Sequence, residues 1–89
     1  MNRKMRLILK DGTTINDGGA GHAGRTLWLY IPQMTMQDAA ALAFDPGKTD
    51  TIVHEYGDKQ DTYDGFTRCT QLLAGEDGTI TIGMEKGES

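Results

Sequence analysis

The side chains that most often carry out catalysis are scarce in this sequence. Its 89 residues include one serine (Ser89), one cysteine (Cys69) and two histidines (His22 and His54). A nucleophilic mechanism needs a serine or cysteine beside a general base, and a structural zinc site draws four ligands from cysteine and histidine. No spacing among these residues matches either arrangement. We therefore expect no catalytic residue, no metal site, no cofactor and no enzymatic activity.

Acidic residues follow one another at intervals of three in one segment, as Glu55, Asp58, Asp61 and Asp64. A calcium-binding loop instead places its oxygen ligands at alternate positions and closes with a glutamate at the twelfth. The twelfth position counted from Asp58 is Cys69. The pattern favours a solvated hairpin, with a weak surface cation site as the alternative.

The glycines at positions 19, 21 and 24 have the spacing of a dinucleotide-binding fingerprint. That motif requires a helix directly after the glycines, because the helix N-terminus holds the pyrophosphate. Here the glycines are followed by the strand-like segment 25–31. We therefore interpret residues 16–24 as a flexible glycine-rich loop rather than a cofactor site.

Length and composition indicate one globular domain that covers residues 1–89. Hydrophobic residues make up 37% of the chain and charged residues 25%, which suits a folded protein. The formal net charge is −4, so the chain lacks the positive charge that drives generic binding to nucleic acid. No apolar run approaches the roughly 20 residues that cross a bilayer, and a lone cysteine suits a reducing compartment. We expect a cytoplasmic protein that binds neither nucleic acid nor membranes.

Hydrophobic alternation predicts the strands. The expected strands cover residues 5–9, 13–15, 25–31, 51–56, 61–73 and 79–84. Gly65 is expected to bend the long strand 61–73. The basic N-terminal stretch, with Arg3, Lys4, Arg6 and Lys10, is interpreted as a charged strand edge that discourages pairing with other chains. Local contact with a phosphate is the alternative. A polar tail, residues 85–89, follows the last strand.

One helix is predicted between the third and fourth strands. Thr35 suits an N-cap, and Asp45 with Pro46 suits the end of the helix. Apolar residues fall on one stripe at helical spacing, namely Met36, Ala39, Ala40, Ala43 and Phe44. Together these segments predict an α+β fold, a small curled antiparallel sheet of five or six strands with one short helix.

Aromatic residues complete the candidates for a binding surface. Trp28 is interpreted as the core anchor of the domain, with a role in an interface contact as the alternative. Tyr30, Tyr56 and Tyr63 have polar tips and acidic neighbours, which favours an interface with another protein. The predicted interface residues are Tyr30, Glu55, Tyr56, Asp58, Asp61, Tyr63 and Asp64.

The order of several segments resembles that of small uncharacterised proteins encoded by prophages of gut Firmicutes. The segments that carry this resemblance are 9–13, 26–32, 35–36, 63–67 and 77–82. Such proteins are commonly encoded among tail and baseplate genes. The resemblance implies a phage or mobile-element setting, a protein partner and no cofactor.

Two functions are consistent with this resemblance. The first is a tail- or baseplate-associated component that docks on a phage structural protein through a strand edge or the aromatic side of a sheet. The alternative is an inhibitor of a bacterial defence protein, of the anti-CRISPR type, whose carboxylates occupy the places of nucleic-acid phosphates. Both act in the host cytoplasm, and the first also places the chain in the virion. Because so small a domain buries little surface, self-association would add stability.

Overall fold

The computed structural model describes residues 5–87 and shows eight strands and two short helices there. The strands are β1 (Met5–Leu9), β2 (Thr14–Asn16), β3 (Gly19–Ala23), β4 (Thr26–Ile31), β5 (Thr51–Tyr56), β6 (Lys59–Asp64), β7 (Arg68–Ala74) and β8 (Ile80–Glu85). The helices are α1 (Met36–Ala43) and α2 (Pro46–Thr49). The α+β class is confirmed, but the prediction of a single sheet of five or six strands is wrong, because the strands form two sheets.

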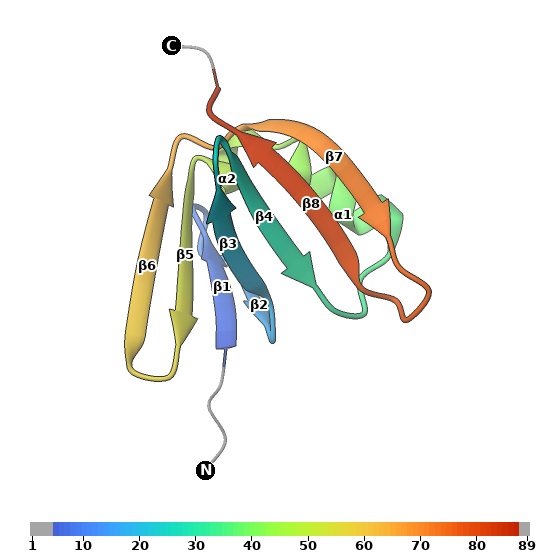
Figure 1. Cartoon of the computed structure of the whole chain (residues 1–89), viewed down its shortest axis with the longest axis horizontal. Coiled ribbons are helices and arrows are strands. Elements are labelled where there is room, and N and C mark those ends of the chain that lie inside the picture. The colour runs from blue at the N-terminus through green and yellow to red at the C-terminus, as the bar shows by residue number, and fades with distance from the viewer. Residues whose placement is uncertain (1–4, 88–89) are drawn as a thin grey trace.

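Both sheets have four strands and are antiparallel throughout. The strand order is β2-β1-β5-β6 in the first sheet and β3-β4-β8-β7 in the second. The chain passes from the first sheet to the second between β2 and β3, returns through the two helices, and crosses again between β6 and β7. Figure 1 shows the first sheet at the left and the second at the right, with α1 against β7 and β8.

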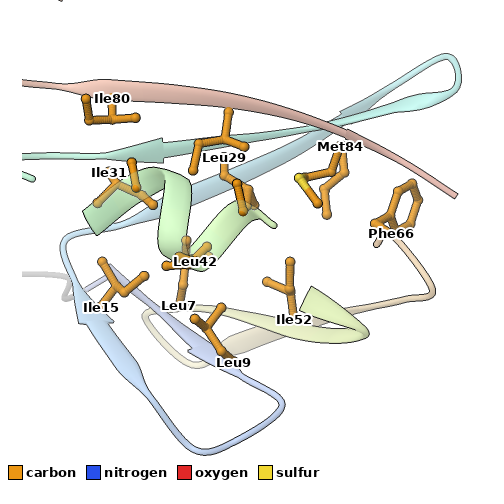
Figure 2. Close-up of a cluster of buried hydrophobic side chains, with 14 residues drawn as sticks. Leu7, Leu9, Ile15, Leu29, Ile31, Leu42, Ile52, Phe66, Ile80 and Met84 are labelled. Carbon is orange, nitrogen blue, oxygen red and sulfur yellow. The ribbon is translucent and has the colours of Figure 1, made fainter. Parts of the chain in front are cut away.

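The core lies where the inner faces of the two sheets meet α1 (Figure 2). Its strand residues alternate with outward-facing ones, as hydrophobic alternation predicts. The buried cluster consists of Leu7, Leu9, Ile15, Leu27, Leu29, Ile31, Ala39, Leu42, Ala43, Ile52, Phe66, Ile80, Ile82 and Met84. Both sheets and α1 therefore depend on one shared core.

The prediction of a flexible loop over residues 16–24 is wrong, because Gly19–Ala23 forms β3. All five residues of β3 pair with β4. Backbone N–H and C=O groups make this ladder, so the strand forms without the alternating side chains that would reveal it in the sequence. A glycine also suits the point where the chain leaves the first sheet, since a Cβ on Gly18 would lie in tight contact, 3.0 Å from Cδ1 of Leu7.

Residues 61–73 do not form one bent strand, because β6 lies in the first sheet and β7 in the second. Gly65, between them, has a φ of 82°, a left-handed conformation that favours glycine. Its N–H donates to the carbonyl of Asp50 at 2.7 Å, and its carbonyl accepts from the N–H of Gly87 at 2.9 Å. Gly65 therefore redirects the chain from one sheet to the other.

The Gly65→Ala variant should lower the free energy of unfolding by about 1–2 kcal/mol, the cost of a left-handed backbone with a Cβ. Gly21→Ala on β3 is the matched control, because a Cβ there meets nothing within 4 Å and its φ is not left-handed. Its unfolding free energy should stay within about 0.5 kcal/mol of the wild type. Urea denaturation measures both. Equal losses for the two variants would contradict the assigned role of Gly65.

The first helix begins as predicted, with the Thr35 hydroxyl accepting a hydrogen bond from the N–H of Asp38 at 3.1 Å. Its predicted apolar stripe is partly wrong. Met36 and Phe44 are exposed, and Leu42, outside that stripe, is buried instead. Phe44 is the C-cap of α1 and lies past its last turn. The helical period therefore no longer determines the direction of its side chain.

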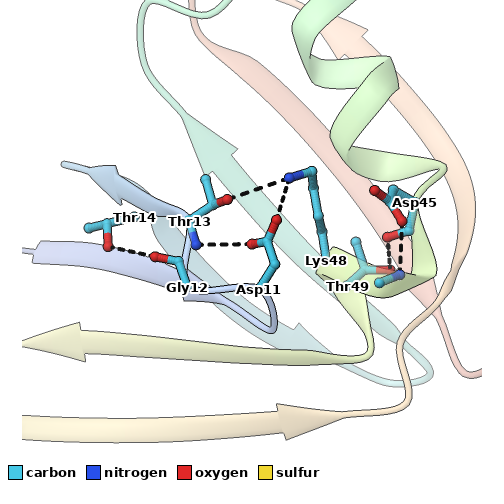
Figure 3. Close-up of polar contacts among 8 residues, drawn as sticks. Asp11, Gly12, Thr13, Thr14, Asp45, Lys48 and Thr49 are labelled. Carbon is cyan, nitrogen blue, oxygen red and sulfur yellow. Dashed lines mark hydrogen bonds and ion pairs between the residues drawn. The ribbon is translucent and has the colours of Figure 1, made fainter.

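The second helix connects α1 to the first sheet (Figure 3). Pro46 follows the end of α1 as predicted, but it also opens α2, where Asp45 accepts a hydrogen bond from the N–H of Gly47 at 2.9 Å. Lys48 of α2 donates to the carboxylate of Asp11 in the β1–β2 turn. This bond holds the pKa of Asp11 well below its ordinary value.

The segment 85–89 is not a free polar tail over the part that the structure describes. Glu85 is the last residue of β8 and lies opposite Arg68, whose guanidinium donates to its carboxylate at 2.8 Å. Gly87 bonds to Gly65 through its N–H. Residues 88–89 lie outside the described range.

Candidate binding surfaces

The structure gathers most of the predicted interface residues on one hairpin and separates one from them. Residues on β5 and β6 alternate between the inner face of the first sheet, which carries buried Ile52, and its outer face. The inner face holds Tyr56, Asp61 and Tyr63, the outer face holds Glu55 and Asp64, and Asp58 lies in the β5–β6 turn. Tyr30 lies on β4, on the outer face of the second sheet.

The β5–β6 hairpin presents an excess of negative charge, with Lys59 as its one cation. Among residues 5–87, no ion pair involves Asp58, Asp61 or Asp64, and all three are exposed. The Tyr56 hydroxyl donates to the Asp61 carboxylate at 2.9 Å, and this bond raises the pKa of Tyr56. The hairpin is therefore an acidic surface in which one tyrosine is held in place by an aspartate.

Basic side chains of β1 and the β1–β2 turn are paired within the first sheet. Arg6 donates to Glu55 at 2.6 Å, and Lys10 donates to Asp50 at 2.9 Å. Because β1 lies between β2 and β5, the interpretation of its basic residues as a charged strand edge is wrong. The other basic residues of this stretch, within residues 1–4, lie outside the described range.

Trp28 lies on the outer face of the second sheet, so its interpretation as the core anchor is wrong. Its neighbours Leu27 and Leu29 are fully buried, and strand alternation places Trp28 on the opposite side. There its ring leans over Gly83 of β8, where a Cβ would lie 3.1 Å from Cζ3 of the indole. The indole is half-buried.

Trp28, Tyr30 and Leu73 form an apolar surface on the outer side of the second sheet, which we name the aromatic face. Tyr30 is 46% exposed and Leu73 is 54% exposed. Thr81 of β8 lies between them, because it pairs with Tyr30 of β4 on one side and with Leu73 of β7 on the other. The β3 residues opposite Trp28 and Tyr30 are glycines, so no β3 side chain stands beside the two rings.

His54 is a buried polar residue on the inner face of the first sheet. Its side chain is buried, its ring centroid lies 4.8 Å from that of Tyr56, and its Nε2 has no hydrogen-bond partner among residues 5–87. Burial lowers the pKa of His54, and Asp61 on the neighbouring strand opposes this effect in part. The imidazole is therefore neutral in the folded protein at pH 7.

The buried imidazole predicts a loss of stability on acidification. The unfolded chain takes up a proton on His54 as the pH falls through the ordinary value of 6.5, whereas the folded chain does so only at lower pH. The free energy of unfolding should therefore fall between about pH 7 and about pH 5.5. Urea denaturation at both pH values should show a smaller fall for His54→Leu. His22→Gln is the control and should show the same pH dependence as the wild type. An equal fall in the free energy of unfolding for all three proteins would contradict the role assigned to His54.

Three aromatic rings join the two sheets on their inner side. His22 of β3, Tyr63 of β6 and Phe66 of the β6–β7 connection have centroids between 5.4 and 6.4 Å apart. Lys86 lies over the Phe66 ring with Nζ 5.1 Å from its centroid. Burial raises the pKa of Tyr63. The rings form an apolar wall beside the point where β8 ends.

Cationic side chains gather beside this wall. Arg25, Arg68 and Lys86, with Glu85, His22 and Phe66, line a pocket of about 380 Å³, which we name the basic pocket. The register explains this grouping: Arg68 lies opposite Glu85, and Leu27 lies opposite Met84, which places Arg25 beside Lys86. Sequence reasoning missed the pocket, because its cations come from three distant segments.

Cys69 is a free, half-buried cysteine on β7. The Cys69 thiol donates to the carbonyl of Gln71 at 3.4 Å, and burial raises the pKa of this thiol, so it stays protonated. Residues 5–87 contain no group of three His, Cys, Asp or Glu side chains that could hold a metal ion. In the same range, no helix has the length and apolar character needed to cross a membrane.

Comparison with family models, curated proteins and solved structures found no match to this chain.

Proposed function

We propose that this chain is a non-enzymatic accessory protein of a phage or prophage, a tail- or baseplate-associated component that acts by binding another protein. The exposed aromatic face is the observation that carries the binding role. The resemblance of the strand and turn segments to prophage-encoded proteins supports the phage setting. We place its action in the host cytoplasm and in the virion.

The aromatic face has the composition of a protein-binding surface. Tryptophan and tyrosine bring a large contact area at a small cost in conformational entropy and dominate the binding energy of many interfaces. The three residues of this face, Trp28, Tyr30 and Leu73, are uncharged. An uncharged aromatic surface fits a protein surface better than it fits the phosphates of a nucleic acid.

The acidic β5–β6 hairpin favours a second function, the inhibition of a bacterial defence protein. Asp58, Asp61 and Asp64 are exposed, and no ion pair neutralises them among residues 5–87. Carboxylates displayed in this way attract the basic surface with which a nuclease holds its nucleic acid. This inhibitor would bind through the hairpin rather than through the aromatic face.

A pull-down from phage-infected or lysogenic cells, with mass spectrometry of the bound proteins, tests the proposed function. Recovery of phage tail or baseplate proteins supports the first function, and recovery of a defence nuclease supports the second. The Trp28→Ala and Asp58→Asn variants are used as parallel baits. If neither class of protein is enriched over an unrelated bait, both functions are contradicted.

A further inference from the structure

The basic pocket concentrates positive charge in a chain whose net charge is negative. Three cations, Arg25, Arg68 and Lys86, and one carboxylate, Glu85, line it. The Glu85 carboxylate takes one hydrogen bond from Arg68 at 2.8 Å, which leaves most of the five guanidinium N–H donors for a ligand. Arg25 and Lys86 have no ion-pair partner among residues 5–87. The lining therefore carries two net positive charges.

Both the charge and the size of the pocket restrict its ligand. A phosphate monoester has a second pKa of about 6 and is close to a dianion at pH 7, so it matches the two net positive charges. Arginine and lysine are the side chains that proteins use most for this group. The volume of about 380 Å³ lies at the lower end of the range for small-molecule sites. It leaves room for an organic group beside the phosphate.

The aromatic wall supplies a place for that organic group. His22 lines the pocket and is exposed, and the buried ring of Phe66 supports it edge to face at 5.4 Å. A sugar or a planar base resting against the His22 ring would lose water-exposed apolar surface. The rings come from β3 and the β6–β7 connection, and the cations come from the β3–β4 turn, from β7 and from the residue after β8. Folding of the second sheet therefore assembles the site.

We propose that the basic pocket binds the dianionic phosphate group of a phosphate monoester. Arg25 and Lys86 bind the phosphate oxygens directly, and Arg68 does so while it keeps its bond to Glu85. The ester's organic group lies against the exposed ring of His22, which Phe66 supports from behind. Binding is non-covalent and needs no metal ion. None of the pocket's lining residues belongs to the aromatic face formed by Trp28, Tyr30 and Leu73. Variants of the pocket therefore test this proposal independently of the protein-binding function.

Isothermal titration of the full chain with adenosine monophosphate, inorganic phosphate and adenosine tests the proposal. The monophosphate should bind at least about tenfold more tightly than adenosine, because each charge-assisted hydrogen bond is worth about tenfold in affinity. A 5′-phosphorylated oligonucleotide and its unphosphorylated counterpart form the second arm. If the phosphorylated strand binds more tightly than adenosine monophosphate, the phosphate that the pocket recognises belongs to a nucleic-acid end. If adenosine monophosphate binds more tightly, it belongs to a small molecule.

Variants of the lining decide whether binding occurs in this pocket. Arg25→Gln with Lys86→Gln should weaken binding of the monophosphate by about a hundredfold. Lys59→Gln at the start of β6 also removes an exposed charge, but it lies outside the pocket and should leave this affinity unchanged. Glu85→Gln should strengthen binding of the monophosphate about threefold or more, because the substitution frees Arg68 and removes a charge that repels the phosphate. Equal affinities for adenosine and its monophosphate would overturn the proposal. The proposal would also be overturned if the Arg25→Gln, Lys86→Gln variant unfolded at the same temperature as the wild type and bound adenosine monophosphate with the same affinity.

Discussion

Replacing Leu29 by alanine is expected to lower the free energy of unfolding by about 3–5 kcal/mol. Leu29 is fully buried on β4, with Ala20 of β3 on one side and Ile82 of β8 on the other. The truncation removes apolar contacts and leaves a cavity that paired strands cannot close. Because domains of this kind have a total stability of about 5–15 kcal/mol, the loss is a large fraction of the whole. Urea denaturation followed by Trp28 fluorescence measures it.

Leu73→Ala is the matched control for that prediction. Its side chain is 54% exposed on the outer side of β7, so the same truncation should cost less than about 1 kcal/mol. A loss at Leu73 as large as that at Leu29 would show that the core has been assigned to the wrong face of the second sheet.

Replacing Trp28 by alanine is expected to separate binding from stability. Since the indole is half-buried on the outer face, its removal should cost about 1–2 kcal/mol of unfolding free energy. If Trp28 is a central contact of the aromatic face, the same change should lower the affinity for the partner protein about 30-fold or more, equivalent to about 2 kcal/mol. Thermal unfolding and titration with the partner recovered by the pull-down measure the two effects.

Phe44→Ala provides the control for the loss of an exposed aromatic ring. Phe44 is 65% exposed at the end of α1, away from the aromatic face, so both affinity and stability should stay close to those of the wild type. A Trp28→Ala protein that is unfolded, or that binds as tightly as Phe44→Ala, would contradict the role given to Trp28.

Strands with a clear hydrophobic alternation were predictable from the sequence. The predicted strand 51–56 coincides with β5, and 25–31 differs from β4 by one residue. The helix start at Thr35 was also predictable, because capping depends on local hydrogen bonding. Local patterns of this kind are set by neighbouring residues, so they can be recognised without knowledge of the tertiary structure.

The division into two sheets could not be predicted in the same way. The strand β3 has three small residues at its start, Gly19, Ala20 and Gly21, and its pairing depends on backbone groups rather than side-chain pattern. At Gly65 a bend within one sheet and a passage between two sheets have the same sequence signal, a glycine between apolar segments. Which of the two occurs depends on the order of the strands.

The face of Trp28 was ambiguous for a related reason. The strand β4 carries large apolar or aromatic residues on both sides, so alternation identified two faces but not which one is buried. Pairing with β8 resolves this, because Leu27 and Leu29 lie opposite Met84 and Ile82 in the core. The basic pocket was out of reach of sequence reasoning, since its cations become neighbours only through the order β4-β8-β7.

The two protein-binding proposals differ in which surface touches the partner. The aromatic face lies on the second sheet, and the acidic residues lie on the hairpin of the first. Removing charge from the hairpin should leave the fold intact, because exposed charges contribute little to stability. Variants of one surface can therefore be compared with variants of the other in proteins that remain folded.

The most direct test of the aromatic face is the affinity of the recovered partner for three proteins: the wild type, the Trp28→Ala, Tyr30→Ala variant, and the Asp58→Asn, Asp61→Asn, Asp64→Asn variant. We predict that the aromatic double variant loses at least about 30-fold in affinity while the acidic triple variant stays within about threefold of the wild type. Loss of binding in the triple variant with full binding in the double variant would contradict the aromatic face as the binding surface.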